Sequence, residues 1–306
     1  MNNQSLPLVS IIIPTYNQQD YITDAIESAL AQNYPSLEII VSDDCSTDQT
    51  GQIASRYTSD SRLIYHRNEN NLGRVGNYHN SAHNIAGGVW AVNLDGDDYY
   101  TSNTFVNDAL NTIYHLNEDD IVAYCYNHSN LEHIKNTISF REIDENRILV
   151  SGKDYFLKYY EIGRFGHPNV LYRRDLGTKL GLYTVPYQAC DFHSLIRIFL
   201  LGNIILDKRA IAYWRVHGKN TTIREVDDKQ RQAMLTFDAI EEFARKYFSP
   251  EELVLWRKNM DTASYLDYIR TYISVNRNLK AVKLLLANPH LKYWYFRCWA
   301  RILFGK

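Results

Sequence analysis

The first 126 residues alternate between short apolar runs and segments in which apolar residues recur with the period of a helix. Leu8–Ile13 is a continuous apolar run rich in β-branched residues, which is typical of a strand buried on both faces. From Ile22 to Leu30, apolar residues follow the spacing i, i+3, i+4, i+7, i+8 and predict an amphipathic helix. A buried strand followed by such a helix is the repeating unit of a parallel sheet.

Segments of the same two kinds continue up to residue 126. Ser46 is predicted to cap a helix that reaches about Tyr57, and Phe105–Ile113 has the apolar spacing of another helix. These units predict an α/β fold with a mostly parallel, Rossmann-like sheet flanked by helices, in which ligands bind beyond the carboxyl ends of the strands. The remaining predicted strands are Leu37–Val41, Leu63–His66, Val89–Leu94 and Ile121–Tyr126.

The pattern becomes less regular after residue 127. From about Asp227 the chain has a helical pattern, with breaks near Ser249-Pro250 and Asn288-Pro289. We therefore expect one α/β domain over residues 1–222 and a C-terminal helical region over residues 223–306.

Cysteine usage and the N-terminus exclude several classes of protein. Cys45, Cys125, Cys190 and Cys298 are far apart and form no CxxC pair, which argues against a zinc site and against a disulfide framework. The N-terminus has no basic leader, and the apolar run from Leu8 is too short to span a bilayer. The sequence predicts a cytoplasmic protein, and nothing in it indicates a nucleic-acid partner.

Three carboxylates follow the predicted strand Val89–Leu94, at Asp95, Asp97 and Asp98, with Gly96 between them. Such carboxylates repel one another unless a cation or hydrogen-bond donors intervene. A hard divalent ion such as Mn²⁺ or Mg²⁺, which prefers oxygen ligands, is the natural partner. The alternative is a solvated acidic turn in which Asp98 caps the next helix.

Two other predicted strands also end in candidate binding residues. Asp43 and Asp44 follow the second strand, where a carboxylate can accept a hydrogen bond from a nucleobase or a ribose; the alternative is that one of them caps a helix. Tyr16 follows the first strand and could stack on a base, although a rigid turn explains Pro14–Asn17 equally well. The chain has no GxGxxG after the first strand and no GxxxxGK[ST], which argues against dinucleotide oxidoreductases and P-loop enzymes.

Together these motifs resemble family 2 glycosyltransferases of the GT-A fold. The resemblance implies a nucleotide-binding half over about residues 8–126 and an acceptor half over about 127–222. It also implies a nucleoside-diphosphate sugar donor, most simply a UDP-sugar, a divalent metal, and inversion at the anomeric carbon. The matching segments are Val9–Asn17 (VSIIIPTYN), Leu37–Asp48 (LEIIVSDDCSTD), Asn71–Gly73 (NLG) and Leu94–Asp98 (LDGDD).

The resemblance also assigns roles in donor binding. Pro14 and Tyr16 would line the base pocket, Asp44 would contact the base, and Asp95 would reach the ribose. Arg74, directly after Asn-Leu-Gly, sits where a basic residue can contact the nucleotide; the alternative is a solvated loop arginine.

Metal binding is implied for Asp97 and Asp98. Trp214–His217 resembles the family's Tyr-Arg-x-His segment, in which His217 would be a further metal ligand or a diphosphate contact. A satisfied structural histidine is the alternative.

The family places its catalytic base, usually in a Glu-Asp pair, at the start of a late helix. Here the candidate is Asp191, although Cys190 stands where the glutamate is usual. An aspartate that only caps the helix is the alternative. Glu161, Asp175 and His193 are weaker candidates for the base.

The acceptor implied by the resemblance is a glycan or a lipid-linked saccharide in surface polysaccharide biosynthesis. A sugar-nucleotide nucleotidyltransferase and a non-catalytic nucleotide-binding module are the alternative functions. A nucleotidyltransferase would usually carry a Gly-rich basic loop after its first strand, which Pro14–Gln18 is not.

The C-terminal segment combines basic and aromatic residues. After Asp267 there are eight basic residues and no acidic one, so residues 1–267 carry −10 because the whole chain carries −2. Lys292–Phe304 holds six aromatics among thirteen residues, a composition typical of a helix lying in the membrane interface. The sequence thus predicts a peripheral contact of residues 268–306 with the cytoplasmic membrane face. The alternative is that this segment packs on the α/β domain or on a second copy of the chain in a homodimer.

We expect the full-length protein to sediment with anionic liposomes at low salt and to be released as salt rises, because each basic residue near an anionic leaflet contributes about 1 kcal/mol and salt screens it. Truncation after Pro289 should abolish sedimentation. Full-length protein that remains in the supernatant at low salt contradicts the membrane interpretation.

Overall fold

The computed structural model describes residues 6–163, 165–185, 189–217, 226–274 and 283. The chain divides into two compact units, one formed by Met1–Pro186 with Cys190–Arg215 and the other by Tyr187–Ala189 with Val216–Lys306. The domain boundary predicted near residue 222 and the aromatic segment 292–304 lie outside the described residues. Both therefore stay predictions.

A nine-stranded sheet forms the centre of the first unit, in the order β3-β2-β1-β4-β9-β6-β10-β8-β7. All strands except β9 and β8 run in the same direction, because only the pairs made by those two strands are antiparallel. The mostly parallel α/β sheet predicted from the sequence is thereby confirmed. The strands are β1 Val9–Thr15, β2 Leu37–Asp43, β3 Leu63–Arg67, β4 Trp90–Asn93, β6 Ile121–Cys125, β7 Phe140–Asp144, β8 Arg147–Ser151, β9 Val170–Arg173 and β10 Asn203–Asp207.

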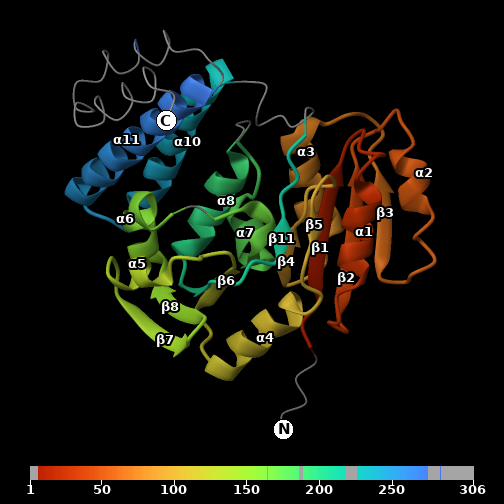
Figure 1. Ribbon diagram of the computed structural model, residues 1–306, viewed down its shortest axis with the longest axis horizontal. Coiled ribbons are helices and arrows are strands. Elements are labelled where there is room, and N and C mark those ends of the chain that lie inside the picture. The colour runs from red at the N-terminus through yellow and green to blue at the C-terminus, as the bar shows by residue number, and fades with distance from the viewer. Residues whose placement is uncertain (1–5, 164, 186–188, 218–225, 275–282, 284–306) are drawn as a thin grey trace. The chain divides into compact units, whose positions relative to one another are not determined.

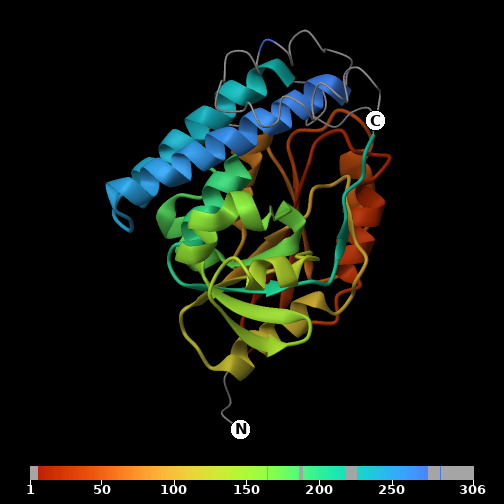
Figure 2. The ribbon, with the colours of Figure 1, turned by 60° about the vertical axis from the view of Figure 1, so that its left-hand side comes forward.

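Helices cover both faces of this sheet (Figures 1 and 2). The first layer is made by α1, α2 and α4, whose apolar residues share one core with the strands. The opposite layer is made by α3, η1, α7 and α8, which contact strands β1, β4, β6 and β9. The bounds are α1 Ile22–Leu30, α2 Thr50–Ser55, α3 Gly73–Asn80, η1 Ser81–Ile85, α4 Phe105–Leu116, α5 Leu131–Lys135, α6 Gly152–Ile162, η2 His167–Asn169, α7 Arg174–Leu180 and α8 Cys190–Phe199.

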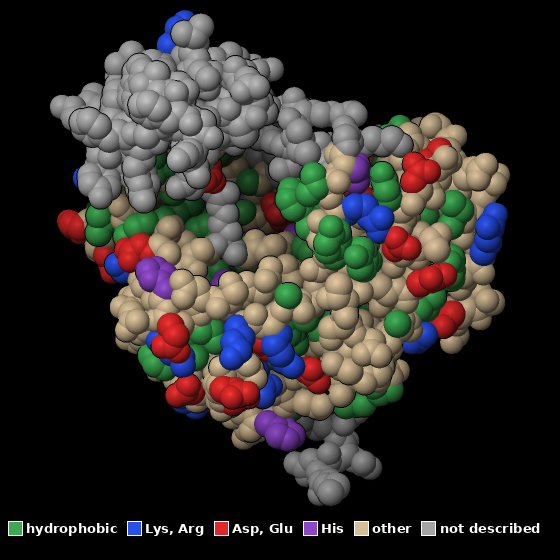
Figure 3. Space-filling view, viewed as in Figure 1, with side chains coloured by type: hydrophobic (Ala, Val, Ile, Leu, Met, Phe, Trp, Pro, Cys, Tyr) green, Lys and Arg blue, Asp and Glu red, His purple; other side chains and the backbone are tan. Residues whose placement is uncertain are grey.

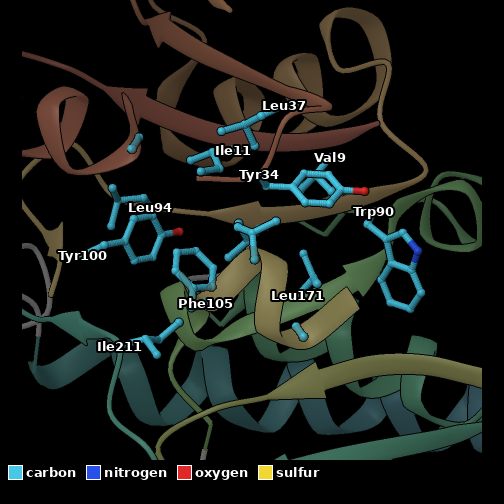
Figure 4. Packing of buried hydrophobic residues seen from close by; sticks show 14 of the residues in the cluster. Val9, Ile11, Tyr34, Leu37, Trp90, Leu94, Tyr100, Phe105, Leu171 and Ile211 are labelled. Atoms are coloured by element: carbon cyan, nitrogen blue, oxygen red, sulfur yellow. The ribbon is translucent and has the colours of Figure 1, made fainter. Parts of the chain in front are cut away.

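Strand β1 is buried on both faces, as its unbroken apolar sequence predicted. Val9, Ile11 and Ile13 alternate toward the layer that contains α1 and α4. Phe105 begins α4 and packs against Tyr100 with ring centroids 4.4 Å apart (Figure 4). Burying one such aliphatic side chain contributes about 1.5–3 kcal/mol, so this central strand fixes the position of the loops at its ends.

The predicted helix cap at Ser46 is wrong. Helix α2 begins only at Thr50, whose backbone N–H donates to Asp48 Oδ1 at 2.9 Å. Ser46 instead donates its N–H to Asp43 Oδ1 at 2.8 Å, next to Cys45 with a φ of +63°. The chain makes a tight turn after β2 before the helix starts, so the helix begins four residues after Ser46.

A second, two-stranded sheet pairs β5 (Tyr99–Tyr100) with β11 (Ala212–Tyr213) in antiparallel register. This pairing brings the residues after the acidic turn together with a segment more than a hundred positions later in the chain. It places Arg215 beside that turn.

The second unit contains α10 (Val226–Ala244) and α11 (Pro250–Ser274), which lie side by side in both views (Figures 1 and 2). The predicted break at Ser249-Pro250 is confirmed, since Ser249 accepts from the backbone N–H of Glu252 while Glu252 accepts from the N–H of Ser249. Among the described helices, none combines the length and apolarity needed to cross a membrane.

Charged side chains of both signs are interspersed on the face of the first unit visible in Figure 3. Several of the unit's surface charges form pairs, such as Lys135 with Glu142 at 2.9 Å. Exposed pairs of this kind contribute little to stability.

Candidate active site

Three loops meet at the carboxyl edge of the parallel strands. Thr15 at the end of β1 lies opposite Asp43 at the end of β2. The N–H of Asp44 donates to the Thr15 carbonyl at 2.9 Å, and the N–H of Gly96 donates to the Pro14 carbonyl at 3.2 Å. The residues after β1, β2 and β4 are therefore neighbours, as the parallel topology predicted.

Gly96 lets the acidic turn come close to β1. A Cβ at this position would lie 2.4 Å from Gln18 Oε1 and 2.8 Å from Thr15 Oγ1. Those two side chains are hydrogen-bonded to each other at 2.7 Å, so they cannot both move away freely. The glycine is required here by space.

Asp95, Asp97 and Asp98 each offer a carboxylate oxygen within 4.8 Å of the others. Asp98 is only 2% exposed and accepts from the backbone N–H of Arg215 at 2.9 Å. Burial raises the pKa of Asp98 to about 8, and the charges of Asp95 and Asp97 add to the rise. The alternative in which Asp98 caps the next helix is wrong, because β5 intervenes and that helix starts at Phe105.

This donor set fits a hard divalent cation. Its carboxylate oxygens converge and one of the three residues is buried. Burial, and then repulsion from Asp95 and Asp97, raise the pKa of Asp98, and a divalent cation would offset both costs of the negative charge.

Asp95 is held by Tyr78 of α3, whose hydroxyl donates to Asp95 Oδ1. Tyr78 is 1% exposed, and burial together with the charge of Asp95 raises its pKa well above the usual value. The phenol therefore stays protonated and remains a donor, which fixes one oxygen of Asp95.

The adjacent aspartates after β2 have different surroundings. Asp43 is fully buried and accepts from the Ser46 N–H at 2.8 Å, Tyr65 at 2.8 Å and Arg67 at 2.9 Å, so its role is structural.

Asp44 accepts at Oδ1 from Asn68 at 2.9 Å and from the Leu72 N–H at 2.8 Å. In the described part of the chain no hydrogen bond reaches its Oδ2. Asp44 is thus oriented yet keeps an oxygen available for a ligand.

Tyr16 lies beside Asp44, at the end of β1, with 47% of its surface exposed, whereas Pro14 is buried. The loop that follows Tyr16 is held in place, since Asn17 has a φ of +53° and its Oδ1 accepts from the Thr47 N–H at 2.8 Å. The structure brings Pro14, Tyr16 and Asp44 together; their contacts with a base stay predictions.

Arg74 and Asp191 lie in the first turns of α3 and α8. Arg74 stays accessible to solvent although many atoms surround it. That crowding lowers its pKa, but interactions with Tyr78, Asp191 and Asp95 raise it by more, so the net shift is upward. The negative charges of Asp191 and Asp95 thus both act on the same guanidinium. Asp191 is the second residue of α8, past the capping position.

Helix α3, which carries Arg74, and η1 are linked through a shared acceptor to the segment that precedes α8. His79 Nδ1 and His83 Nε2 both contact the carbonyl oxygen of Leu182, at 3.1 and 3.0 Å. Because a carbonyl only accepts, each ring must donate an N–H there. The contact fastens α3 and η1 to the chain shortly before α8.

The other candidates for the base are already engaged or kept neutral. Hydrogen bonds from Tyr160, and then Lys158, hold the pKa of Glu161 below its usual value despite some burial. Asp175 is paired with Arg173 through two contacts of 2.7 Å.

His193 is buried, and burial together with Arg197 lowers its pKa to about 3. A histidine with such a pKa is a poor proton acceptor at neutral pH. Asp191 therefore remains as the base candidate, and its charge acts on the same guanidinium, that of Arg74, as the charge of Asp95 does.

His217 belongs to the second unit, which begins again at Val216. Its part in metal binding stays a prediction. Two residues that matter to the turn were not found from the sequence, namely Tyr78 and Arg215. Arg215 lies inside the quoted segment Trp214–His217 and could have been singled out there, whereas no local signal distinguishes Tyr78 among the tyrosines of this chain.

Comparison with known proteins gives a family match. The family model described as "Glycosyl transferase family 2" matches residues 10–181. A putative teichuronic acid biosynthesis glycosyltransferase, TuaG of Bacillus subtilis, is 28% identical over 210 residues, which cover 64% of this chain and 80% of that protein.

Solved structures have a similar fold. Staphylococcus aureus TarS (residues 1–349) in complex with UDP-GlcNAc has a TM-score of 0.57 at 20% identity, covering 89% of this chain and 83% of that one. The mannosyltransferase PcManGT of Pyrobaculum calidifontis, in complex with GDP-Man and Mn²⁺, has a TM-score of 0.56 at 18% identity, covering 93% and 75%. At these identities the likeness confirms the GT-A fold.

We expect Gly96→Ala to lower the free energy of unfolding by about 1–3 kcal/mol, because the new methyl group would overlap Thr15 and Gln18. Gly87→Ala is the matched control, since its Cβ would meet only ordinary contacts at 3.6 Å; it should stay within about 0.5 kcal/mol of wild type. Urea unfolding of both variants measures the difference, and equal midpoints would contradict the steric argument.

Proposed function

The chain belongs to glycosyl transferase family 2, and from that premise we propose that it is an inverting glycosyltransferase. Its donor is a nucleoside-diphosphate sugar, and its acceptor is a hydroxyl of a glycan or of a lipid-linked saccharide. The observation that carries the proposal is the meeting of Asp44, Asp95, Asp97 and Asp98 at adjoining strand ends. That arrangement offers one carboxylate to a base, one to a ribose and two to a metal ion that would bind the diphosphate.

For the donor we propose a UDP-sugar. The available Oδ2 of Asp44 can accept from the N–H of a pyrimidine base, and the exposed ring of Tyr16 beside it can stack on that base. The similar TarS was solved with UDP-GlcNAc and PcManGT with GDP-Man, so a nucleotide-sugar is the shared ligand class. Asp95, oriented by Tyr78, would reach the ribose.

Asp97 and Asp98 would hold a Mn²⁺ or Mg²⁺ ion. A part of His217 in binding the metal stays a prediction from the sequence alone. When bound, the ion would act as a Lewis acid that neutralises charge developing on the leaving diphosphate. PcManGT was solved with Mn²⁺, and the carboxylate donor set of this chain suits the same class of ion.

Asp191 acts as the general base in this proposal. It takes the proton of the acceptor hydroxyl while that oxygen forms a bond to the anomeric carbon. The bond from this carbon to the diphosphate oxygen breaks on the opposite face, which inverts the configuration, and the nucleoside diphosphate leaves. Arg74, which is close to both Asp191 and Asp95, contributes a positive charge toward the departing diphosphate.

We further propose a role in surface polysaccharide biosynthesis on the cytoplasmic membrane face. The naming of TuaG as a putative teichuronic acid biosynthesis enzyme supports this pathway class. A lipid-linked acceptor would explain the basic and aromatic composition of residues 268–306.

A panel of UDP-, GDP- and dTDP-sugars tests the function. With Mn²⁺, one donor should raise the melting temperature and be hydrolysed or transferred with release of the nucleoside diphosphate, and EDTA should stop turnover. Asp97→Asn should lower turnover by at least about 10²-fold even at saturating donor. The exposed Asp119→Asn serves as the control and should match wild type.

Other outcomes identify the alternatives. Release of pyrophosphate would indicate a nucleotidyltransferase, and donor binding without turnover would indicate a binding module. Full turnover in EDTA would exclude the metal role.

Asp191→Asn should retain donor affinity and lose transfer by about 10²–10⁴-fold, because the amide cannot accept the acceptor proton. Calorimetric titration with the donor nucleotide and the rate of transfer measure the two effects separately. Unchanged transfer with unchanged nucleotide affinity would leave Asp191 a purely structural residue.

A further inference from the structure

Arg215 contacts the acidic turn without being one of its carboxylates. We infer that Arg215 is a positioning residue that holds Asp97 and Asp98 in the arrangement that binds a divalent cation. This inference rests on the proposed function, since the cation belongs to that reaction. It follows from three sets of contacts made by Arg215, through its backbone N–H and its side chain.

The first set lies on the turn itself. The backbone N–H of Arg215 donates to Asp98 Oδ1 at 2.9 Å, and its side-chain Nε donates to the carbonyl oxygen of Asp97 at 3.0 Å. One bond orients a carboxylate and the other fixes the peptide that joins the two acidic residues. Together they restrict both the side chain and the backbone of the turn.

The second set lies at the far end of the guanidinium. Arg215 Nη2 is 2.6 Å from Asp24 Oδ2 of helix α1. This helix is firmly placed, because Ile22, Ala25 and Ile26 on its inner face are fully buried. The arginine therefore connects the acidic turn to a rigid element of the first unit.

Aromatic rings form the third set. The guanidinium carbon lies 5.1 Å from the ring centroid of Tyr21 and 5.3 Å from that of Tyr99. Tyr99 stacks in turn on Tyr213 at 5.1 Å within the β5–β11 pair. Contacts with two rings and two hydrogen-bond acceptors require a planar group with several N–H donors in fixed directions, which lysine lacks.

Electrostatics alone would make Arg215 unfavourable here, because a positive charge repels a nearby cation. Asp24 offsets that charge at 2.6 Å, so what the residue contributes is geometry. A substitution that keeps the charge but removes the planar group therefore separates the two effects. Arg215→Lys is that substitution.

The experiment measures Mn²⁺ binding by titration of the full-length chain, with free Mn²⁺ followed by electron paramagnetic resonance. Residues that orient metal ligands typically change metal affinity by about 10–100-fold when they are replaced, and we expect Arg215→Lys to weaken Mn²⁺ binding by at least about 10-fold. The matched control is Arg62→Lys. Arg62 also pairs with an aspartate, Asp60 at 2.8 Å, but precedes β3 at the opposite sheet edge; this variant should bind Mn²⁺ as wild type does.

Asp24→Ala, which removes the acceptor for Arg215 Nη2, provides a second test that leaves the turn itself intact. Measured at about 1 M ionic strength, where the Debye length is about 3 Å, it should weaken Mn²⁺ binding in the same direction, because only the anchor on α1 is lost. Urea midpoints of the variants should remain near that of Arg62→Lys, since a positioning role does not require a change in global stability.

The results separate this inference from the proposed function. If wild type binds Mn²⁺ and Arg215→Lys binds it equally well, Arg215 has no positioning role and the proposed function stands. If wild type binds no Mn²⁺ and transfers sugar in EDTA, the metal part of the proposed function fails and the inference fails with it. A loss of Mn²⁺ affinity that merely follows a loss of stability, with equal losses in the control, also overturns the inference.

Discussion

Repulsion among Asp95, Asp97 and Asp98 is the constraint that the rest of the first unit accommodates. Each of the three offers a carboxylate oxygen within 4.8 Å of the others, Asp98 is buried, and hydrogen bonds from the surrounding chain hold the carboxylates of Asp95 and Asp98. The hydrogen bonds to Asp95 and Asp98 come from a phenol and a backbone N–H, which carry no charge. Such donors orient the carboxylates and leave their negative charge available to a cation.

The hydrogen-bond donors around them also distinguish the two aspartates after β2. Asp43 accepts from three donors, one of them the charged Arg67, and so closes the turn that leads to α2. Asp44, one residue later, is held at one oxygen only. Identical side chains at adjacent positions therefore have different surroundings: donors of the chain engage both oxygens of Asp43, whereas the donors around Asp44 reach its Oδ1 alone among the described residues.

The elements of secondary structure that have a clear apolar periodicity could be predicted from the sequence. The strands β1–β4 and β6, the helices α1, α2 and α4, and the meeting of the strands' carboxyl ends follow from apolar spacing and from the parallel topology. Helix α3, η1 and β5 were not predicted. Features set by distant partners could not be read in this way. Ser46 bonds to Asn17 and Asp43 rather than capping a helix, and Arg215 reaches an aspartate 117 positions earlier in the chain. The hairpin of β7 and β8 was likewise hidden, because the pattern after residue 127 is weak.

The antiparallel pairing of β5 with β11 also has a consequence for the order in which the protein matures. The acidic turn is complete once translation has passed residue 98. Strand β11 and Arg215, which hold the turn, are added only after residue 211. A nascent chain that contains all of residues 8–126 therefore still lacks the contacts that shape the turn. The acidic turn therefore gains its contacts with Arg215 late in translation, after the segment that contains Asp191 has also been made.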